Sequence, residues 1–287
     1  MPVNTVGVIG LGLIGGSMAR AVHSRTGCSV YGTDADERVV EAAISEGVIA
    51  QRLEDHYGDI DLLIVALYPA DVVDTILKVA PELSKGCIVV DCTGIKQMIC
   101  EGLSDRLSAE GIRFIGGHPM AGKEVSGYTN SCNDLFDKAS MILVRDDNTD
   151  EEALLAAKDF FAKLGFSGIK ITTAKEHDRV IAYTSQLAHV VSSAYIKSPT
   201  LENRYGFSAG SFKDMTRVAK LNEQMWADLF LANDQALSSE IKELIGHLTE
   251  YADAIDARDR DRLVELLRDG RIRKEEDTKK DGKWISG

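Results

Sequence analysis

The sequence has few of the residues that typify disulfide-rich, metal-binding or membrane-spanning proteins. It contains five cysteines among 287 residues, and no two of them form a C-x-x-C pair. A disulfide framework or a zinc site is therefore not expected, and a reducing cytoplasm is the expected location. No apolar run approaches the roughly eighteen residues of a membrane span, and no charged stretch followed by an apolar one opens the chain. We therefore expect neither a membrane span nor a signal peptide.

Positive charge is also scarce. Lysine and arginine number 33 and aspartate and glutamate 45, which gives a formal net charge of −12. A chain of this balance lacks the extended basic surface that nucleic acids or anionic membranes require. A small anionic substrate stays compatible with it, since a local cluster of cations can hold one. The hydrophobic share of 44% and the length suffice for two domains with buried cores.

Short apolar runs alternate with helical segments in the first part of the chain. Continuous apolar strands separated by helices predict a parallel sheet that is covered on both faces. Right-handed crossovers make such a sheet doubly wound, as in a Rossmann-type α/β fold. Strands are expected at 5–10, 29–32, 62–66, 88–91, 114–116, 141–144 and 168–171, and helices include 13–24, 36–46, 69–83 and 150–164.

The strand pattern stops after Thr172, which predicts an all-helical second domain. Residues 175–197 are apolar nearly all round, as in a buried central helix, and residues 241–255 keep apolar side chains on one helical face. We expect an NAD-binding Rossmann-type domain at 1–172, a helical domain at 173–270 and a charged, poorly ordered tail at 271–287.

Glycines follow the first predicted strand in the pattern G-x-G-x-x-G. Gly10 permits the tight turn, Gly12 lets the main chain approach a pyrophosphate, and Gly15 lets the helix pack on the strand. Asp34 ends the next strand nineteen residues after Gly15, where its carboxylate can accept from both ribose hydroxyls and would repel a 2′-phosphate. The alternative is a plain glycine turn with a helix-capping aspartate. We favour NAD, bound by Gly10, Gly12, Leu13, Ile14, Gly15 and Asp34.

His118 opens the run HPMAGKE at 118–124. The proline and glycine indicate a turn directly after a strand, and such turns at the carboxyl end of an α/β sheet commonly carry the chemistry. An imidazole titrates near neutral pH and suits acid–base work there. The alternative is a histidine that only satisfies the loop with hydrogen bonds.

Three further segments carry the residue types of an active site. Gln186 and His189 form a polar patch on the apolar helix, where polar groups are costly unless they meet partners or a ligand. Lys213 and Arg217 lie four residues apart on a predicted helix start, and the run DCTGIK at 91–96 follows a strand. Their plainer explanations are a hydrogen-bonded core histidine, surface cations and a helix cap.

In order and spacing these segments resemble the prephenate dehydrogenase family, which includes arogenate-specific enzymes. The resemblance extends from the N-terminus to about Ile255. It rests on GLGLIGGS at 10–17, DCTGIK at 91–96, HPMAGKE at 118–124, EHD at 176–178, SQLAH at 185–189 and FKDMTRVA at 212–219, with Trp226 beyond.

The resemblance implies oxidation of a cyclohexadiene that bears a ring hydroxyl, a ring carboxylate and a pyruvyl or alanyl side chain. NAD takes hydride from the carbon that bears the hydroxyl, while the ring carboxylate leaves as carbon dioxide. The product is 4-hydroxyphenylpyruvate from prephenate, or tyrosine from arogenate. Aromatisation of the ring supplies the driving force, so the enzyme mainly polarises the substrate hydroxyl and positions the substrate against the cofactor. The choice between the two substrates depends on one keto or amino group and stays open.

The resemblance also implies roles for single residues. His118 matches the catalytic histidine that accepts the hydroxyl proton, and His189 matches a second active-site histidine. Arg217 matches the arginine that holds a substrate carboxylate through its planar fork. Trp226 matches an aromatic that can approach the partner's site in the family's dimers, which implies a homodimer built by the helical domain. The implied substrate contacts are Arg217, Lys213, Gln186, Lys123 and Thr93.

The chain departs from the family pattern at three places. Gly94 stands where family members often carry a serine beside the catalytic histidine, so we expect Thr93 or a water to donate there instead. Gln186 replaces the first histidine of the common S-H-L-x-H pattern, which keeps hydrogen bonding but loses titration. Lys123 replaces a common threonine, and we expect it to attract a substrate carboxylate.

Two other functions fit parts of the pattern. A β-hydroxyacid dehydrogenase also joins a Rossmann domain to a helical one. It needs a catalytic lysine on the first long interdomain helix, where this chain presents Gln186 and His189. A non-catalytic NAD-binding sensor would need no set such as His118, His189 and Arg217. The resemblance therefore favours an NAD-dependent prephenate dehydrogenase, with an arogenate dehydrogenase as the alternative, and no metal site is expected.

Overall fold

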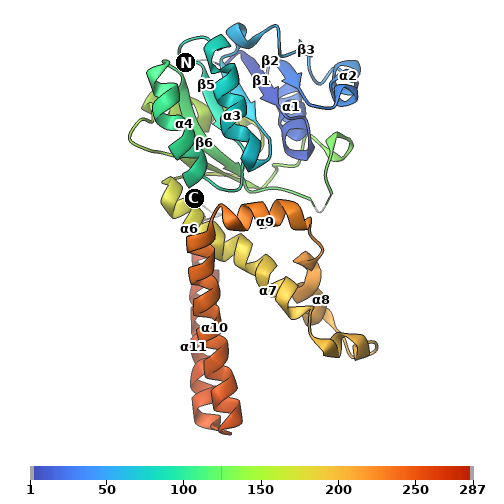
Figure 1. Ribbon diagram of the computed structural model, residues 1–287, viewed down its shortest axis with the longest axis vertical. Coiled ribbons are helices and arrows are strands. Elements are labelled where there is room, and N and C mark those ends of the chain that lie inside the picture. The colour runs from blue at the N-terminus through green and yellow to red at the C-terminus, as the bar shows by residue number, and fades with distance from the viewer. Residues whose placement is uncertain (1–2, 124, 285–287) are drawn as a thin grey trace.

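The computed structural model describes residues 3–123 and 125–284. Figure 1 shows a domain of strands and covering helices, and beside it a group of helices that includes one long hairpin. The last strand ends at Thr172 and, within the described residues, only helices follow it. None of the described helices has the length and apolar character needed to cross a bilayer.

An eight-stranded sheet forms the centre of the first domain. Its strands are β1 (Thr5–Ile9), β2 (Ser29–Thr33), β3 (Gln51–Arg52), β4 (Leu62–Val65), β5 (Ile88–Asp91), β6 (Arg113–Pro119), β7 (Ser140–Val144) and β8 (Gly168–Thr172). Their order is β3-β2-β1-β4-β5-β6-β7-β8, so the direction of travel reverses between β1 and β4. Such a reversal opens a crevice at the carboxyl ends of these strands, where α/β folds bind dinucleotides. The two-residue edge strand β3 was not predicted.

The predicted Rossmann-type doubly wound sheet is confirmed, and it departs from parallel pairing at one pair of strands. β6 runs parallel to β5 over residues 113–115 and then pairs antiparallel with β7 from Gly116 onward. His118 therefore lies inside β6, opposite Ile142, and not on the predicted turn. The reason is that β7 supplies hydrogen-bonding partners beyond the paired part of β5, so β6 stays extended through Pro119.

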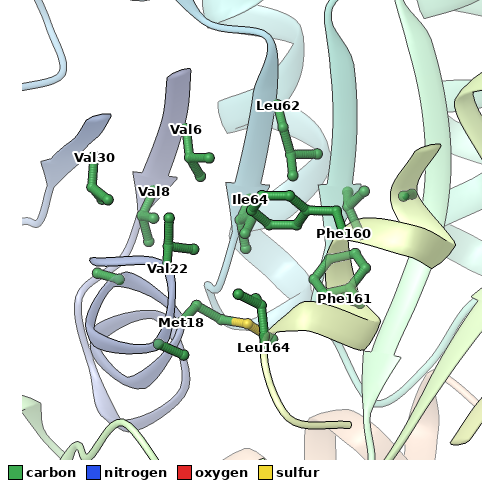
Figure 2. Packing of buried hydrophobic residues seen from close by; sticks show 14 of the residues in the cluster. Val6, Val8, Met18, Val22, Val30, Leu62, Ile64, Phe160, Phe161 and Leu164 are labelled. Atoms are coloured by element: carbon green, nitrogen blue, oxygen red, sulfur yellow. The ribbon is translucent and has the colours of Figure 1, made fainter. Parts of the chain in front are cut away.

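Helices cover both faces of the sheet. They are α1 (Leu13–Arg25), α2 (Glu37–Ser45), α3 (Pro69–Val79), α4 (Gln97–Ala109) and α5 (Glu151–Lys163), with short 3-10 turns η1 (Tyr57–Asp59), η2 (Ala80–Glu82) and η3 (Tyr128–Asn130). On one face, Met18 and Val22 of α1 and Phe161 of α5 belong to the same core as Val8 and Ile64 of the sheet (Figure 2). α3 and α4 pack on the other face in a second core. Because both faces are dry, β4 is apolar at every position.

The second domain begins with one continuous helical segment. Its elements are α6 (Ala174–Ile181), the π-helical turn η4 (Ala182–Gln186), α7 (Leu187–Tyr195), η5 (Pro199–Asn203), α8 (Gly210–Thr216), η6 (Arg217–Ala219), α9 (Glu223–Leu231), α10 (Asp234–Asp256) and α11 (Arg260–Trp284). π-helical turns such as η4 are frequent at functional sites. α9 lies between the sheet domain and α7, whereas α10 and α11 form a hairpin that points away from the sheet (Figure 1).

The helix at 175–197 was predicted to be buried on all sides. In the single chain this prediction is wrong, because part of the helix is exposed. Tyr183 and Tyr195 are 63% and 49% exposed. The apolar character of this segment therefore exceeds what its own chain buries, as in helices that meet a second protein surface.

The charged tail predicted at 271–287 is helical in its described part, and its predicted poor order stays a prediction. α11 continues as a helix as far as Trp284, and residues 285–287 lie outside the described part. Ion pairs at helical spacing, such as Arg271 with Glu275, stabilise this highly charged stretch as a helix.

Candidate active site

The loop between β1 and α1 is tightly packed at two glycines and open at a third. Gly10 has a positive φ of 83°, and a Cβ there would lie 2.5 Å from the carbonyl oxygen of Ala66. A Cβ at Gly15 would lie 1.8 Å from the carbonyl oxygen of Gly10, so α1 could not pack as it does. At Gly12, by contrast, a Cβ would meet no atom within 4 Å. The open position is where a pyrophosphate can approach the main chain.

The charges around this loop also suit a dinucleotide. The first turn of α1 contains no acidic residue, so its N–H groups and positive dipole end are free to face phosphates. Asp34 follows β2, and its carboxylate accepts from the N–H of Leu11 at 2.7 Å and from the N–H of Asp36 at 2.9 Å. These bonds fix the carboxylate beside the loop and leave lone pairs for ribose hydroxyls. The residues present therefore fit NAD.

His118 lies beside Gly94, which follows the carboxyl end of β5. A Cβ on Gly94 would lie 3.8 Å from Nε2 of His118, so the absent side chain leaves room next to that nitrogen. Leu229 of α9 lies 3.8 Å from the same position and bounds the space from the helical domain. The Nε2 side of the imidazole therefore faces the junction between the two domains.

The other nitrogen of His118 begins a chain of hydrogen bonds to two residues for which the sequence predicted no role. Its Nδ1 lies 2.9 Å from Nε2 of His177, whose own Nδ1 lies 2.6 Å from a carboxylate oxygen of Asp178. Both residues belong to α6, in the second domain. Asp178 also accepts from the N–H groups of Lys96 and Gln97 at 2.8 Å, which caps the N-terminus of α4. The histidine of one domain is thus hydrogen-bonded to the other domain.

A buried ion pair lies close to the two histidines. Lys96 and Asp91 are fully buried and bonded to each other. Asp91 also accepts from the N–H of Gly117, the neighbour of His118. The hydroxyl of Thr93 donates to Asp91 at 2.6 Å and accepts from Lys96 at 2.8 Å. The buried hydroxyl of Thr93 is engaged within this network, so of the two predicted donors, Thr93 or a water, the structure favours the water.

Both histidines are held in the neutral state. Burial lowers the pKa of His118 well below its ordinary value, and the positive charge of Lys96 lowers it further. Burial also lowers the pKa of His177, and this effect exceeds that of the hydrogen bond to Asp178, which favours the charged form. A neutral imidazole keeps the lone pair that a general base requires.

A second group of side chains lies in the helical domain. Nδ1 of His189, on α7, lies 3.1 Å from the carbonyl oxygen of Val218, so this nitrogen is the donor. The ring of His189 lies against Trp226 of α9, with ring centroids 3.7 Å apart. Burial lowers the pKa of His189, and the charge of Arg217 adds to this effect. α9 borders both groups, because Leu229 follows Trp226 by three positions and reaches the space beside Gly94.

Gln186, a predicted substrate contact, is a packing residue in this structure. It is buried, and its amide donates to the carbonyl of Leu229 and accepts from Asn233. Both ends of the amide therefore join η4 to α9 and to the start of α10. These contacts do not support the predicted binding of substrate by Gln186, which stays a prediction.

Lys123 and Lys213, the two lysines predicted to contact substrate, form no hydrogen bond with His118 or His189 among the residues that the structure describes. Lys123 donates to the carbonyl oxygen of Asn130 at 3.1 Å and to Sγ of Cys132 at 3.2 Å, within its own loop. This loop is attached to α1, because the N–H of Cys132 donates to Ser17. Lys123 is therefore held on the loop that contacts the cofactor helix, which does not support its predicted role toward a substrate carboxylate. Lys213 is exposed on α8.

His177, Asp178 and Lys96 are the functional residues that the sequence-based prediction missed. His177 and Asp178 lie in the EHD segment that contributed to the family resemblance, yet His177 meets a histidine 59 positions away. Lys96 lies in the DCTGIK segment, where a lysine after a strand is ordinarily exposed. The resemblance of these two segments to the family was the available sign, and it did not show which side chains meet.

Comparison with known proteins gives matches along nearly the whole chain. Residues 18–170 match the family model "Prephenate dehydrogenase, nucleotide-binding domain", and residues 173–269 match "Prephenate dehydrogenase, dimerization domain". A cyclohexadienyl dehydrogenase of Zymomonas mobilis is 31% identical over 276 residues, which cover 92% of both chains.

Solved structures agree with these matches. Prephenate dehydrogenase from A. aeolicus, in complex with hydroxyphenyl propionate and NAD+, superposes with a TM-score of 0.85 at 26% identity and covers 96% of this chain and 99% of that one. Arogenate dehydrogenase of Synechocystis superposes with a TM-score of 0.83 at 26% identity over 95% of this chain and 99% of that one. With its open glycine loop, its neutral histidine at the domain junction and these matches in both domains, the chain belongs to the prephenate dehydrogenase family.

Proposed function

We propose that this chain converts prephenate to 4-hydroxyphenylpyruvate by NAD-dependent oxidative decarboxylation, a step of tyrosine biosynthesis. The observation that carries the proposal is a neutral His118 whose Nε2 lies beside Gly94, where no side chain fills the space. A substrate in this space could give its hydroxyl proton to the base. The matches to both family models support the substrate class.

Arogenate is the second candidate substrate. It has the same ring as prephenate and differs in one amino group on the side chain, so its product would be tyrosine. The similarity to the arogenate dehydrogenase of Synechocystis supports this alternative.

The cofactor site follows from the glycine loop. Bound NAD supplies the hydride acceptor of the reaction. Gly12 and the first turn of α1 would hold the pyrophosphate, with Leu13 and Ile14 at the helix start, and Asp34 would hold the ribose hydroxyls. A 2′-phosphate would meet the carboxylate of Asp34, so we expect NAD to be preferred over NADP.

His118 would accept one proton from the substrate hydroxyl and later return it to the same oxygen. Its Nε2 accepts the hydroxyl proton as the neighbouring carbon loses hydride, and the carbinol becomes a ketone. The ring carboxylate then leaves as carbon dioxide, and its bonding electrons aromatise the ring. The ring oxygen takes the proton back from His118 and becomes the hydroxyl of the product. The reaction therefore releases no net proton from this hydroxyl.

The helical domain would bind the charged groups of the substrate. Arg217 would hold a carboxylate through its planar fork, and Lys213, four positions earlier, would add a second cation. His189 keeps Nε2 for the substrate, because its Nδ1 is bonded to Val218. Trp226 packs on this imidazole and would limit the access of water.

A homodimer in the cytoplasm completes the proposal. The family model that matches residues 173–269 is described as a dimerization domain. The exposed tyrosines of the segment 175–197 are available for such an interface. The five cysteines are free, which suits a reducing compartment.

Parallel assays with prephenate and arogenate test the proposed function. The chain is mixed with NAD and each substrate, and NADH absorbance and carbon dioxide are followed. We expect both products with prephenate, at the higher kcat/KM of the two. A higher value with arogenate would make that compound the substrate, and no NADH with either would exclude both. A panel of β-hydroxyacids, expected to be inert, serves as the control.

A further inference from the structure

The hydrogen bonds from Asp178 through His177 to His118 determine which nitrogen of each ring carries a proton. A carboxylate can only accept, so Nδ1 of His177 must be the donor in its 2.6 Å contact with Asp178. A neutral His177 then has a bare Nε2, which must accept in its 2.9 Å contact with Nδ1 of His118. Nδ1 of His118 consequently carries the hydrogen, and Nε2 carries the lone pair.

The surroundings keep both rings in the neutral form that this argument needs. His177 and its partner Asp178 are nearly fully buried, and the ammonium of Lys96 is fully buried close by. Burial and this positive charge both lower the pKa of His118 and of His177. Free imidazoles of histidine prefer the opposite tautomer, with the hydrogen on Nε2. The protein therefore reverses the intrinsic preference of His118.

We propose that His177 and Asp178 are positioning residues of the helical domain, which hold His118 as the Nδ1–H tautomer and so present the lone pair of Nε2 to the substrate hydroxyl. The inference rests on the proposed function, because it assigns a purpose to the free lone pair beside Gly94. It adds two residues from the second domain to a reaction whose base lies in the first.

A proton relay through the same residues fits the structure less well. The hydroxyl proton returns to the ring oxygen of the product, so no proton has to leave by a second route. Asp178 is also engaged with the N–H groups of Lys96 and Gln97 at the start of α4, and these contacts need both of its oxygens as acceptors. The carboxylate thus acts as a fixed acceptor and not as a carrier.

The arrangement makes the state of the base depend on contact between the domains. His118 lies on β6, whereas both positioning residues lie on α6. Asp178 bonds simultaneously to His177 and to the N-terminus of α4, so α6 must be docked on the sheet domain for the chain of bonds to form. A loss of this docking would leave His118 free to take its preferred tautomer, with Nε2 protonated.

Heteronuclear NMR of the histidine ring nitrogens in the full chain tests the proposal directly. The signals of His118 are assigned by their loss in His118→Asn. In the wild type without substrate we expect a protonated Nδ1 and a bare Nε2. In His177→Gln the amide can donate as well as accept, so both tautomers of His118 should appear while its hydrogen bond is retained.

Steady-state kinetics of the same variants link the tautomer to the reaction. In His177→Gln and Asp178→Asn we expect kcat to fall about 10–100-fold, the usual effect of losing a residue that orients an active-site group. KM and the Kd for NAD should change less than about twofold on the same argument, because neither residue contacts substrate or cofactor. His247→Gln, on the exposed surface of α10, is the matched control and should leave both the tautomer and kcat unchanged.

Each outcome separates this proposal from the proposed function. A wild type that is active but carries the hydrogen of His118 on Nε2 would overturn the positioning role alone. A lower kcat in His177→Gln without any change in the tautomer would also overturn it. A wild type that is inactive with both prephenate and arogenate would overturn the proposed function, and the positioning role with it.

Discussion

The chemistry of His118 depends on its neighbours as much as on its own side chain. An exposed histidine titrates near neutral pH and would be partly charged there. Here burial and the charge of Lys96 lower the pKa of His118, and His177 contacts its Nδ1. No side chain at Gly94 fills the space next to its Nε2. The same residue type at another point of the sheet would lack these properties.

Replacement of His118 by asparagine removes the base but keeps a polar side chain of similar reach. We expect kcat to fall by roughly 10²–10⁴, the usual contribution of a positioned acid–base group. The Kd for NAD, measured by fluorescence titration, should stay within a factor of about two, since the glycine loop is untouched. An equal loss of cofactor affinity would instead mean that His118 supports the structure of the cofactor site.

The lowered pKa of His118 predicts the pH dependence of the free enzyme. A base works only when it is unprotonated, so a pKa below the ordinary value of 6.5 moves the acid limb of kcat/KM to lower pH. We expect kcat/KM to stay level as the pH falls through 6.5 and to decrease only below that value. The check is a profile of kcat/KM in buffers of constant ionic strength, with stability of the chain confirmed at each pH. An acid limb centred at the ordinary histidine pKa would contradict the buried, neutral state.

Side chains of similar polarity differ in whether they can reach a ligand. His118 and Asp34 were predicted from their positions after strands, and their polar atoms lie where a ligand can approach. Gln186 was predicted from a polar patch on an apolar helix and Thr93 as a substitute for a serine missing at Gly94, but both make hydrogen bonds to internal partners. The residue type determines which hydrogen bonds a side chain can make. Its burial and its neighbours in the fold determine which of these bonds it does make.

The turn from β1 to α1 shows how much one element can be understood from sequence alone. Its glycine spacing predicted a tight turn, a close approach of a ligand and a close helix contact. The structure has a positive φ at Gly10, open space at Gly12 and close packing at Gly15. These geometries depend on residues that are neighbours in sequence, so local pattern was sufficient.

Alanine at two of these glycines should separate cofactor binding from stability. At Gly12 a Cβ meets nothing and the backbone is extended, so Gly12→Ala should keep its thermal midpoint while NAD binds about tenfold or more weakly. At Gly15 a Cβ would meet a backbone oxygen, so Gly15→Ala should lose about 1–3 kcal/mol of unfolding free energy. Thermal unfolding without ligand and NAD titration distinguish the two. Equal thermal midpoints for both variants would contradict this account of the loop.

The pairing of β6 could not be predicted from its own residues. The segment from Arg113 to Pro119 is compatible with a strand followed by a turn, and proline and glycine favour the turn. β7 returns antiparallel and extends the strand, which places His118 within the sheet. The position of the His118 side chain is therefore set by a strand that begins more than twenty residues later.

The two domains together build the site. The neighbouring strands β5 and β6 bring Gly94 and His118 close together. From the other domain, α6 contributes His177 and α9 contributes Leu229. Figure 1 shows α9 between the sheet domain and α7. Contact between the domains therefore decides both the shape of the site and the protonation of its base.

Assembly of two chains should depend on the apolar face of α10. Ile245 and Leu248 are 56% and 58% exposed and share one face of this helix, where burial against a second chain would be favourable. We expect the double variant Ile245→Asp, Leu248→Asp to be a folded monomer, and the control Glu243→Gln to remain a dimer. Light scattering coupled to size exclusion gives the mass, and circular dichroism checks the helix content. A double variant that stays dimeric would place the interface elsewhere.

The amino-acid sequence by itself determined the alternating strands and helices of the first domain, the glycine loop and the choice of His118 and Asp34. These features rest on contiguous residues and on periodicity, which do not need the rest of the chain. Only the tertiary structure decided that β7 runs antiparallel to β6 and that Thr93 and Gln186 bond to internal partners. It also decided that His177, held by Asp178, contacts Nδ1 of His118. The physical reason is that hydrogen-bond partners and burial come from residues that are distant in sequence, such as the 59 positions between His118 and His177.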